Sequence, residues 1–453
     1  MVEIPRIVVA GTHSGVGKTT VASGLMAALS SKGYKVAPFK VGPDFIDPSY
    51  HTLAAGRPGR NLDAFLSGPR MIGPLFANGV QDADIAVVEG VMGLFDGKSG
   101  GGELASTAHI AKLLDAPVVL VVDARAMARS AAALVHGYMT FDPELRVSGV
   151  MFNRVGSSAH EKMLRDAMKP LRIPVLGTLR RDNAIQAPDR HLGLVPVAER
   201  RDEARRSLDA LGAVISDSIN LDEVLRLAGS AGPLHAEPWR PEFADLDPSF
   251  SVRVAVATGP SFSFLYKENL ELLEVAGVEI VTFDPTTDEA LPPGTDALYL
   301  GGGFPETYAA ALSANVGMRE GVRNFTASGR PVVAECGGLL YLARELDGHP
   351  MCGVLDATAR MTRRLTLGYR EARALTDSPL AEAGTQVRGH EFHYSTIEPK
   401  AGEMPAWDLA GRGPEGFGAG NVHASYLHTH WAAMPELPRR LVRAAWSAAE
   451  VRV

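Results

Sequence analysis

A glycine-rich segment near the start of the chain carries a lysine and two threonines at a spacing that can bind phosphate. It reads GTHSGVGKTT over residues 11–20, between an apolar run and a helical pattern. Glycines let backbone N–H groups face phosphate oxygens, a lysine neutralises those oxygens, and a threonine hydroxyl ligates Mg²⁺. We therefore predict an ATP site formed by Gly15, Gly17, Lys18, Thr19 and Thr20.

The spacing of this segment departs from the usual phosphate loop by one residue. The strict count places the first glycine at position 12, where Thr12 stands, and Gly11 comes one residue earlier. This variant spacing resembles the loop of dethiobiotin synthetase and its relatives. A plain glycine turn is the alternative, but the strand and helix expected on either side favour the phosphate loop.

Carboxylates follow apolar runs at two further places. Glu89 ends the run over 85–88, and Lys40 opens the segment KVGPDFIDP, which also holds Asp44 and Asp47. The carboxyl ends of parallel strands bind ligands, and Mg²⁺ prefers oxygen ligands such as carboxylates. These residues predict a metal and ligand site. A proline-kinked turn with solvated acids is the alternative for the second segment.

Two more polar residues lie at the ends of apolar stretches. Asp96 lies in the segment GLFDG and is a further candidate acid for the ligand site. A simple turn without a role in binding is the alternative. Asn153 ends the run over 150–152, and its amide pairs a donor with an acceptor, as an adenine edge does. We predict that Asn153 binds ATP.

A cysteine followed by two glycines is the candidate nucleophile. The segment VVAECGGLLY places Cys336 between an apolar run and a helical pattern, which is the layout of a nucleophile elbow. A helix N-terminus there favours the thiolate, and the N–H of Gly337 can face an oxyanion. The upstream loop with Gly302 and Gly303 offers further N–H donors. A buried structural cysteine is the alternative, and it is our interpretation of Cys352.

Histidines near the end of the chain supply the base that a cysteine nucleophile needs. The segment ASYLHTHW carries His428 and His430. Either histidine can take and return a proton. A zinc site is the alternative, because His390 and His393 add a second pair of histidines at a ligand-like spacing.

Short apolar runs alternate with helical patterns through the first part of the chain, which predicts a parallel α/β sheet. A helix is predicted over Lys18–Lys32, and the charged, Leu- and Ala-rich stretch over 180–229 is interpreted as helical. The predicted strands are Ile7–Ala10, Val36–Phe39, Ile85–Val88, Val118–Val122, Val150–Phe152 and Val175–Leu176.

A proline-rich stretch without periodicity divides the chain. We predict an ATP-binding domain over 1–231, a linker over 232–250 and a second domain over 251–453. The second domain restarts the alternation of strand and helix. Its predicted strands are Val252–Ala257, Val278–Phe283, Ala297–Leu300 and Pro331–Ala334.

Composition limits the class of protein. The chain has 453 residues, of which 46% are hydrophobic, so we expect two or three domains with real cores. Its net charge of −7, without a basic stripe, gives no support for nucleic acid or an anionic membrane as partner. Only two cysteines occur, which suits a reducing compartment. With neither a signal peptide nor a membrane-spanning run in the sequence, we predict a soluble cytoplasmic enzyme.

The motifs together resemble the family of cobyrinic and hydrogenobyrinic acid a,c-diamide synthases over nearly the whole chain. The resemblance rests on the run over 40–51, on RNLD at 60–63 and on EGVMGLFDG at 89–97. The Cys336 segment, the glycine loop and the late histidines resemble the triad-type glutamine amidotransferases. In these amidotransferases the base is the histidine of a His-x-Glu motif. Alignment of the segment HTH at 428–430 with that motif implies His428 as the base and puts His430 at the position of the glutamate.

The resemblance implies a fold, an activity and roles for the candidate residues. It implies a dethiobiotin-synthetase-like P-loop domain followed by a flavodoxin-like amidotransferase domain. The enzyme would be an ATP-dependent carbon–nitrogen ligase of cobalamin biosynthesis that amidates the a and c acetate carboxylates of a corrinoid with ammonia from glutamine. Neither nucleic acid nor membrane would be a partner, and a homodimer stays open. Mg²⁺ would be held by Thr19, Asp47 and Glu89, and the carboxylate would be activated by Lys40, Asp44, Asp47 and Asp96.

Three other functions stay open on the sequence. One is the a,c-diamidation of another tetrapyrrole such as nickel-sirohydrochlorin. A second is cobyric acid synthase, in which the segment GPDFIDP is not expected. The third is a P-loop ATPase with a regulatory flavodoxin-like domain, which would need neither Cys336 nor His428.

Overall fold

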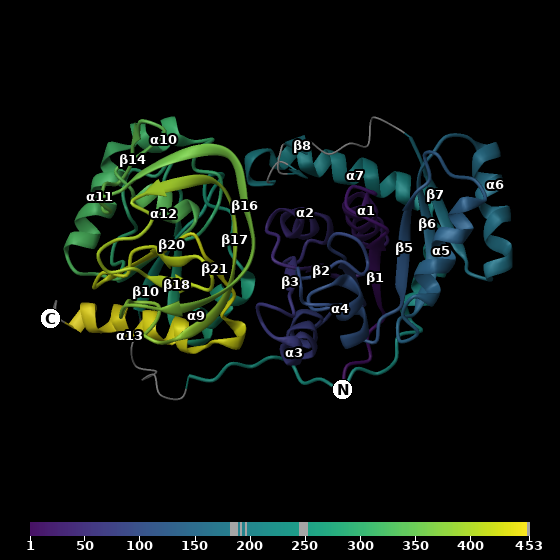
Figure 1. The fold of residues 1–453 in the computed structure, drawn as a ribbon, viewed down its shortest axis with the longest axis horizontal. Coiled ribbons are helices and arrows are strands. Elements are labelled where there is room, and N and C mark those ends of the chain that lie inside the picture. Colours follow the sequence, from purple (N-terminus) through teal and green to yellow (C-terminus); the bar gives the residue numbers. More distant parts are fainter. Residues whose placement is uncertain (182–188, 191–192, 195–196, 244–251, 451–453) are drawn as a thin grey trace. The chain divides into compact units, whose positions relative to one another are not determined.

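The computed structural model describes residues 1–181, 189–190, 193–194, 197–243 and 252–450. The chain divides into two compact units, Met1–Arg240 and Pro241–Val453 (Figure 1). The first part of the predicted linker is bonded to the first unit, because the backbone N of Val2 donates to the carbonyl of Leu234 at 2.8 Å. The rest of that linker, residues 244–250, lies outside the described residues.

The first unit is built on a seven-stranded sheet in which all neighbouring strands are parallel, in the order β3-β2-β4-β1-β5-β6-β7. The six predicted strands are confirmed, and the short β3 is an addition. The apolar residues of the central strands are fully buried, as a parallel sheet requires. The strands are β1 Arg6–Gly11, β2 Val36–Val41, β3 Arg60–Leu62, β4 Ile85–Glu89, β5 Val118–Asp123, β6 Val147–Val155 and β7 Val175–Arg180.

The predicted helix after the glycine segment is confirmed as α1, which ends at Ser31. It packs closely on α7, because a Cβ added at Gly24 would lie 2.6 Å from Ile215 Cγ1. The helices of this unit are α1 Lys18–Ser31, α2 Ile46–Ala55, α3 Pro69–Gly79, α4 Thr107–Leu113, α5 Ser130–Thr140, α6 Ser158–Met168, α7 Arg201–Ser218 and α8 Leu221–Ala228.

The prediction of helix throughout 180–229 is wrong in its first part. The described residues include a short antiparallel pair of strands, β8 Asp189–Arg190 and β9 Gly193–Leu194, then a 3-10 helix over Val197–Glu199, before α7 begins at Arg201. The rest of this part, residues 182–188, 191–192 and 195–196, lies outside the described residues. The sequence around this pair contains two prolines and a glycine, which disfavour a helix interior. The later part, α7 and α8, is helical as predicted.

The second unit contains a five-stranded parallel sheet with strand order β11-β10-β12-β13-β20. With the strands numbered within this sheet alone, that order is 2-1-3-4-5, which is the flavodoxin-like arrangement predicted. Its strands are β10 Val252–Ala257, β11 Val278–Phe283, β12 Ala297–Leu300, β13 Val332–Glu335 and β20 Val422–Ser425. Its helices are α9 Lys267–Val275, α10 Ala309–Ala314, α11 Val316–Ala327, α12 Gly337–Leu342 and α13 Glu436–Glu450.

A second, mixed sheet lies between α12 and α13 in the sequence, and the sequence analysis did not predict it. Its centre is a long antiparallel hairpin of β16 and β17, which arches over this unit in Figure 1. β17 pairs with β21, which places His390 opposite His428 in the register. Its strands are β14 Glu345–Leu346, β15 His349–Pro350, β16 Thr358–Ala374, β17 Gln386–Glu398, β18 Trp407–Leu409, β19 Gly413–Glu415 and β21 His428–Thr429.

Across the part of the chain that the structure describes, no helix combines the length and the apolar character that crossing a bilayer requires.

Candidate active site

The glycine segment forms a loop between β1 and α1. Gly15 and Gly17 have φ values of 81° and 98°, which glycine adopts without strain. The amide nitrogen of Asn153 donates to the carbonyl of Val16 at 2.8 Å, and a Cβ at Gly17 would lie 2.1 Å from that nitrogen. The Asn153 side chain therefore braces the loop, a contact that the sequence analysis missed. Its predicted binding of adenine stays a prediction.

Lys18 is held at the mouth of this loop. Its Nζ donates to the carbonyl of Met92 at 2.5 Å and to that of His13 at 3.3 Å. Burial, followed by the like charge of Lys40, lowers the pKa of Lys18 to about 8. Because this pKa is above 7, Lys18 is protonated and positively charged in most molecules at neutral pH.

Glu89 is the centre of a buried polar cluster in the first unit. Its Oε1 accepts hydrogen bonds from Thr19 Oγ1 at 2.6 Å and from Lys40 Nζ at 2.8 Å. Its Oε2 lies 2.6 Å from His51 Nε2. Asp47 Oδ2 lies 2.6 Å from Lys40 Nζ and 3.4 Å from Thr19 Oγ1. The structure thus brings one hydroxyl, two carboxylates, a lysine and a histidine together.

The charges of this cluster shift one another's pKa. Burial alone would raise the pKa of Glu89, but Lys40 and the hydrogen bond to His51 hold it well below its usual range. Burial and the charge of Glu89 raise the pKa of Asp47. Burial alone would lower the pKa of Lys40, but Asp47 and Glu89 raise it above its usual value. At neutral pH an ionised Glu89 therefore lies beside a charged Lys40.

The other two acids of this region accept hydrogen bonds from nearby backbone groups. The two carboxylate oxygens of Asp44 accept from the backbone N–H groups of Ile46 and Asp47 at 3.2 and 3.0 Å, where α2 begins. Asp96 Oδ2 accepts from the backbone N–H of Gly93 at 3.0 Å, and its side chain is exposed. The charge of Asp44 acts on Lys40 and Asp47, and that of Asp96 acts on Lys18.

Cys336 lies at a sharp turn between β13 and α12. Its φ of 48° and ψ of −96° lie in a region that residues other than glycine rarely adopt. Its backbone N donates to the carbonyl of Ser425 at 2.7 Å, which ties the turn to the end of β20. The local geometry is the strained strand-to-helix turn expected of a nucleophile elbow.

The glycine loop after β12 packs against both the elbow and a histidine. A Cβ at Gly337 would lie 3.0 Å from the backbone N of Gly303. A Cβ at Gly302 would lie 2.4 Å from His428 Cε1. These close approaches bring Cys336, the glycine loop and His428 into one site.

Burial sets the charge of the two reactive side chains. Cys336 is 4% exposed and His428 is 1% exposed. Burial, followed by the charge of Glu306, raises the pKa of the Cys336 thiol well above its usual value. Burial, followed by the charge of His390, lowers the pKa of His428 to about 3. Burial thus opposes the thiolate that the position of Cys336 before α12 favours, and the thiolate stays a prediction.

His430 contacts a different element from His428. Its Nε2 lies 3.5 Å from Glu268 Oε2 of α9, and its ring packs on Tyr266 with centroids 4.8 Å apart. Its Nδ1 accepts from the backbone N of Ala432 at 3.4 Å. The two candidate bases are thus separated: His428 lies at the glycine loop, and His430 lies at α9.

Glu391 of β17 forms an ion cluster near the same site. It pairs with Arg370, and its Oε2 lies 2.7 Å from Arg412 Nη1. Burial alone would raise the pKa of Glu391, but a hydrogen bond from His393 and the charge of Arg370 lower it to about 2. This carboxylate is therefore ionised, and its charge also acts on His428.

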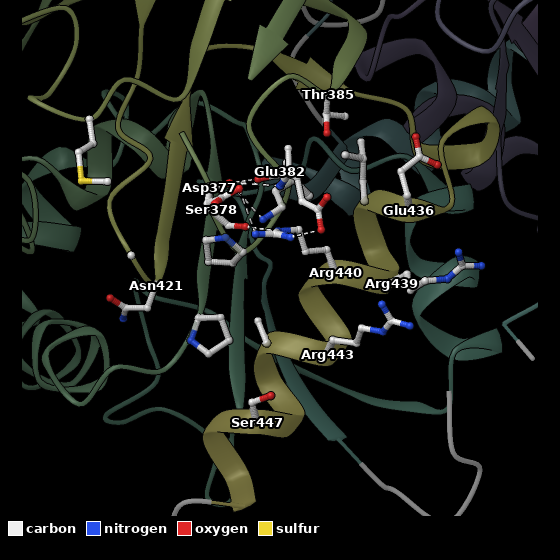
Figure 2. A pocket seen from close by; sticks show the side chains of 18 of the residues that line it. Asp377, Ser378, Glu382, Thr385, Asn421, Glu436, Arg439, Arg440, Arg443 and Ser447 are labelled. Carbon is white, nitrogen blue, oxygen red and sulfur yellow. Dashed lines mark hydrogen bonds and ion pairs between the residues drawn. The ribbon is translucent and has the colours of Figure 1, made fainter. Parts of the chain in front are cut away.

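A cavity of about 880 Å³ lies elsewhere in the second unit (Figure 2). It is bordered by α13 and by Pro331 and Asn421, which directly precede β13 and β20. Cys336 follows the opposite end of β13. Arg440 crosses the cavity wall and donates to Ser378 O at 2.6 Å and to Glu382 Oε1 at 2.7 Å. None of the predicted site residues lines it.

Comparison with known proteins identifies both halves of the chain. Residues 7–195 match the family model described as the CobQ/CobB/MinD/ParA nucleotide binding domain, and residues 253–435 match the CobB/CobQ-like glutamine amidotransferase domain. A hydrogenobyrinate a,c-diamide synthase of Streptomyces coelicolor is 55% identical, over 97% of this chain and 97% of its own. The chain belongs to the a,c-diamide synthase family. The resemblance inferred from its motifs is confirmed.

Two further relatives of this family extend the comparison. A hydrogenobyrinate a,c-diamide synthase of Mycobacterium tuberculosis is 51% identical over 97% of each chain. A cobyrinate a,c-diamide synthase of Synechococcus is 43% identical over 98% of each chain. As an a,c-diamide synthase, the chain is a glutamine-dependent amidating enzyme with a nucleotide-binding domain.

Three polar residues near the two sites were not among the predicted site residues. His51 lies one helical turn after Asp47 on α2, so an i, i+4 search from the acid would have found it. Glu268 and Glu335 come from segments far from His428 in the sequence, and no local pattern marks their contacts.

Adding a methyl group to the glycine loop of this synthase is expected to damage only the glutamine site. In Gly302→Ala, the new Cβ would meet the His428 ring at 2.4 Å, so the ring must move. We expect glutaminase kcat to fall about 10²-fold, the typical effect of a displacement near 1 Å. Ammonia-dependent amidation should persist. Unchanged glutaminase turnover would contradict the packing of His428 on this loop.

The Cys336 thiol is expected to react slowly with alkylating agents when glutamine is absent. Its raised pKa means that the thiolate fraction at pH 8 is small and grows as the pH rises. Iodoacetamide should label Cys336 at least about tenfold more slowly than free cysteine, as measured by peptide mass spectrometry. The Cys336→Ala variant is labelled in parallel, and its labelling measures the background that Cys352 contributes. Rapid labelling that is constant between pH 6 and 8 would show a thiolate instead.

Proposed function

We propose that this chain converts the a and c acetate carboxylates of hydrogenobyrinate or cobyrinate to amides, using ATP and glutamine, in cobalamin biosynthesis. The observation that carries the proposal is the presence in one chain of a phosphate loop with a buried acidic cluster and of a strained cysteine beside a buried histidine. The relatives from Streptomyces coelicolor and Synechococcus that carry these names match 97% and 98% of this chain.

The first unit binds and orients ATP. The backbone N–H groups around Gly15 and Gly17 face the phosphates, Lys18 neutralises them, and Thr19 and Thr20 supply hydroxyls. Asn153 holds the loop in shape through the Val16 carbonyl. The positive charge that Lys18 keeps at neutral pH supports this role.

The donor set of the acidic cluster fits Mg²⁺. Thr19 Oγ1, Asp47 Oδ2 and Glu89 Oε1 are oxygens that lie within one cluster. Mg²⁺ uses one or two carboxylates together with phosphates and water, which this set and ATP would provide. When bound there, Mg²⁺ would supply charge neutralisation on the phosphates.

Activation of the carboxylate proceeds by phosphoryl transfer. An oxygen of the substrate carboxylate attacks the γ-phosphorus of ATP, the bond to the β,γ-bridging oxygen breaks, and ADP leaves. Lys40, beside Asp47 and Glu89, offers positive charge for the incoming carboxylate. Asp44 and Asp96 hold the loops that border this space. Ammonia then attacks the acyl carbon, and phosphate leaves.

The second unit releases that ammonia from glutamine. His428 takes the proton of the Cys336 thiol as the sulfur attacks the side-chain amide carbon, and it returns the proton to the departing nitrogen. Water then hydrolyses the thioester and gives glutamate. The N–H groups of Gly337 and of the loop with Gly302 and Gly303 stabilise the oxyanion. The contact of His430 with Glu268 supports His428 rather than His430 as the base.

Isotope transfer tests this proposal. The chain is incubated with ATP, Mg²⁺, glutamine and hydrogenobyrinate whose carboxylates carry oxygen-18. We expect one labelled phosphate for each amide formed, because the oxygen that leaves the carboxylate leaves with phosphate. Oxygen-18 found in AMP instead would show that the activated intermediate is an acyl adenylate and not an acyl phosphate. If hydrogenobyrinate is not amidated, the proposed substrate is wrong.

A further inference from the structure

We propose that Glu335 is the positioning residue that aligns His428 with Cys336, in place of the carboxylate that the His-x-Glu motif of other amidotransferases supplies. The inference rests on the proposed role of Cys336 and His428 in glutamine hydrolysis. Glu335 directly precedes Cys336 in the chain, and its partner Thr429 directly follows His428. The contact therefore joins the neighbours of the two reacting residues.

The contact between Glu335 and Thr429 is double. Glu335 Oε1 accepts from the backbone N of Thr429 at 3.0 Å and from its Oγ1 at 2.7 Å. Glu335 Oε2 accepts from Tyr299 Oη at 3.2 Å. Glu335 is 3% exposed and Thr429 is 1% exposed, so water does not compete for these bonds. One carboxylate thus fixes both the backbone and the side chain of the residue beside His428.

The remaining polar groups of Thr429 are also bonded. Its carbonyl accepts from Asn269 Nδ2 at 2.9 Å, and its Oγ1 accepts from Trp431 Nε1 at 2.9 Å. Asn269 Oδ1 in turn accepts from the backbone N of Trp431 at 2.8 Å. The segment after His428 is therefore held on both sides, and Glu335 is the member of this network that belongs to the nucleophile elbow.

The other nearby carboxylates are engaged differently. Glu268 lies 3.5 Å from His430, one residue beyond Thr429. Glu391 is bound to Arg370 and Arg412. Only Glu335, among these three, bonds to a residue adjacent to His428 from a position adjacent to Cys336. A shift of the His428 backbone relative to Cys336 must therefore stretch the bonds that Glu335 makes.

Paired substitutions at Glu335 separate positioning from folding. Glu335→Met removes the acceptor at nearly constant volume, whereas Glu335→Gln keeps an oxygen that can accept from Thr429 and places an amide donor towards Tyr299. We expect Glu335→Met to lower glutaminase kcat about 10- to 100-fold with KM for glutamine within about threefold, since misalignment slows the chemical step. Glu335→Gln should restore kcat to within about fivefold of the parent.

The chain offers a matched control in Glu415. This carboxylate is as buried as Glu335 and accepts from Ser425 Oγ at 2.6 Å and from the backbone N of Tyr426 at 2.9 Å. Glu415 therefore holds the residues that precede His428, whereas Glu335 holds the residue that follows it. The pairing of β20 with β13 also restrains the residues held by Glu415. Glu415→Met should lower thermal stability as Glu335→Met does, but glutaminase kcat should stay within about threefold of the parent.

The outcomes distinguish this inference from the proposed function. Ammonia-dependent amidation should be unchanged in every variant, which shows that the chain is folded and that the first site works. Equal loss of kcat in Glu335→Met and Glu415→Met would overturn the positioning role, as would a full kcat in Glu335→Met. Should Glu335→Met fail to fold, Thr429→Val removes the shorter, hydroxyl half of the contact, and an unaltered kcat there would overturn the positioning role. Absence of glutaminase turnover in the parent protein would instead remove the proposed function.

Discussion

Replacing Cys336 with alanine is expected to abolish synthesis from glutamine while synthesis from ammonium salts continues. The variant lacks the sulfur that attacks the amide, and no other described cysteine lies at a strained turn of this kind. Loss of a nucleophile typically costs a factor of about 10³ or more in kcat, so glutamine-dependent product should fall to background. Ammonia bypasses this step, because it enters after the thioester chemistry. Product is measured by chromatography with each nitrogen donor.

Cys352→Ala is the matched control for that experiment. Cys352 is fully buried, and its backbone N donates to the carbonyl of Tyr341 at 2.9 Å, which indicates a structural role. The control should keep glutamine-dependent synthesis within a few-fold of the parent. Loss of both nitrogen routes in Cys336→Ala, with the control active, would contradict the division of labour between the two units.

Replacing Lys18 with alanine is expected to remove synthesis with either nitrogen donor. The Lys18 side chain is 8% exposed and lies where the loop would receive ATP phosphates, so its loss leaves their charge without a partner. Removing one such electrostatic group commonly costs about 10² to 10³ in rate. Glutaminase turnover, measured as glutamate release, should be much less affected because Cys336 and His428 are intact.

Lys32→Ala gives the control for Lys18→Ala. Lys32 is exposed at the other end of α1, so the control changes the charge of the same helix without touching the loop. It should leave synthesis unchanged. Product formation by Lys18→Ala at more than about a tenth of the parent rate would contradict the assignment of the phosphate loop.

Features that depend on neighbouring residues could be predicted from the sequence. The buried parallel strands are continuous apolar runs, so six strands of the first unit and four of the second were found from them. The glycine segment and the Cys336 segment are local motifs in which glycines must sit next to a strand and a helix. Their geometry, with φ of 98° at Gly17 and 48° at Cys336, follows from those few residues.

Features that depend on distant pairing could not be predicted in the same way. β16 carries exposed charged residues such as Arg363 and Arg364, and its register shifts between Met361 and Thr366, so its sequence shows no clean alternation. The Glu335 and Thr429 contact joins residues that only the folded sheets bring together. At Cys336 the local motif favours a thiolate, whereas burial, which the motif does not reveal, raises the pKa of the thiol.

The most direct measurement follows the amides themselves. The chain is incubated with ATP, Mg²⁺ and either ordinary or amide-nitrogen-15 glutamine, with hydrogenobyrinate and with cobyrinate in parallel, and the corrinoid is analysed by mass spectrometry. We predict a product in which two carboxylates have become amides, with the two preparations differing by the mass of two nitrogen labels. No amide on either macrocycle, while glutamate and ADP are still produced, would contradict the account.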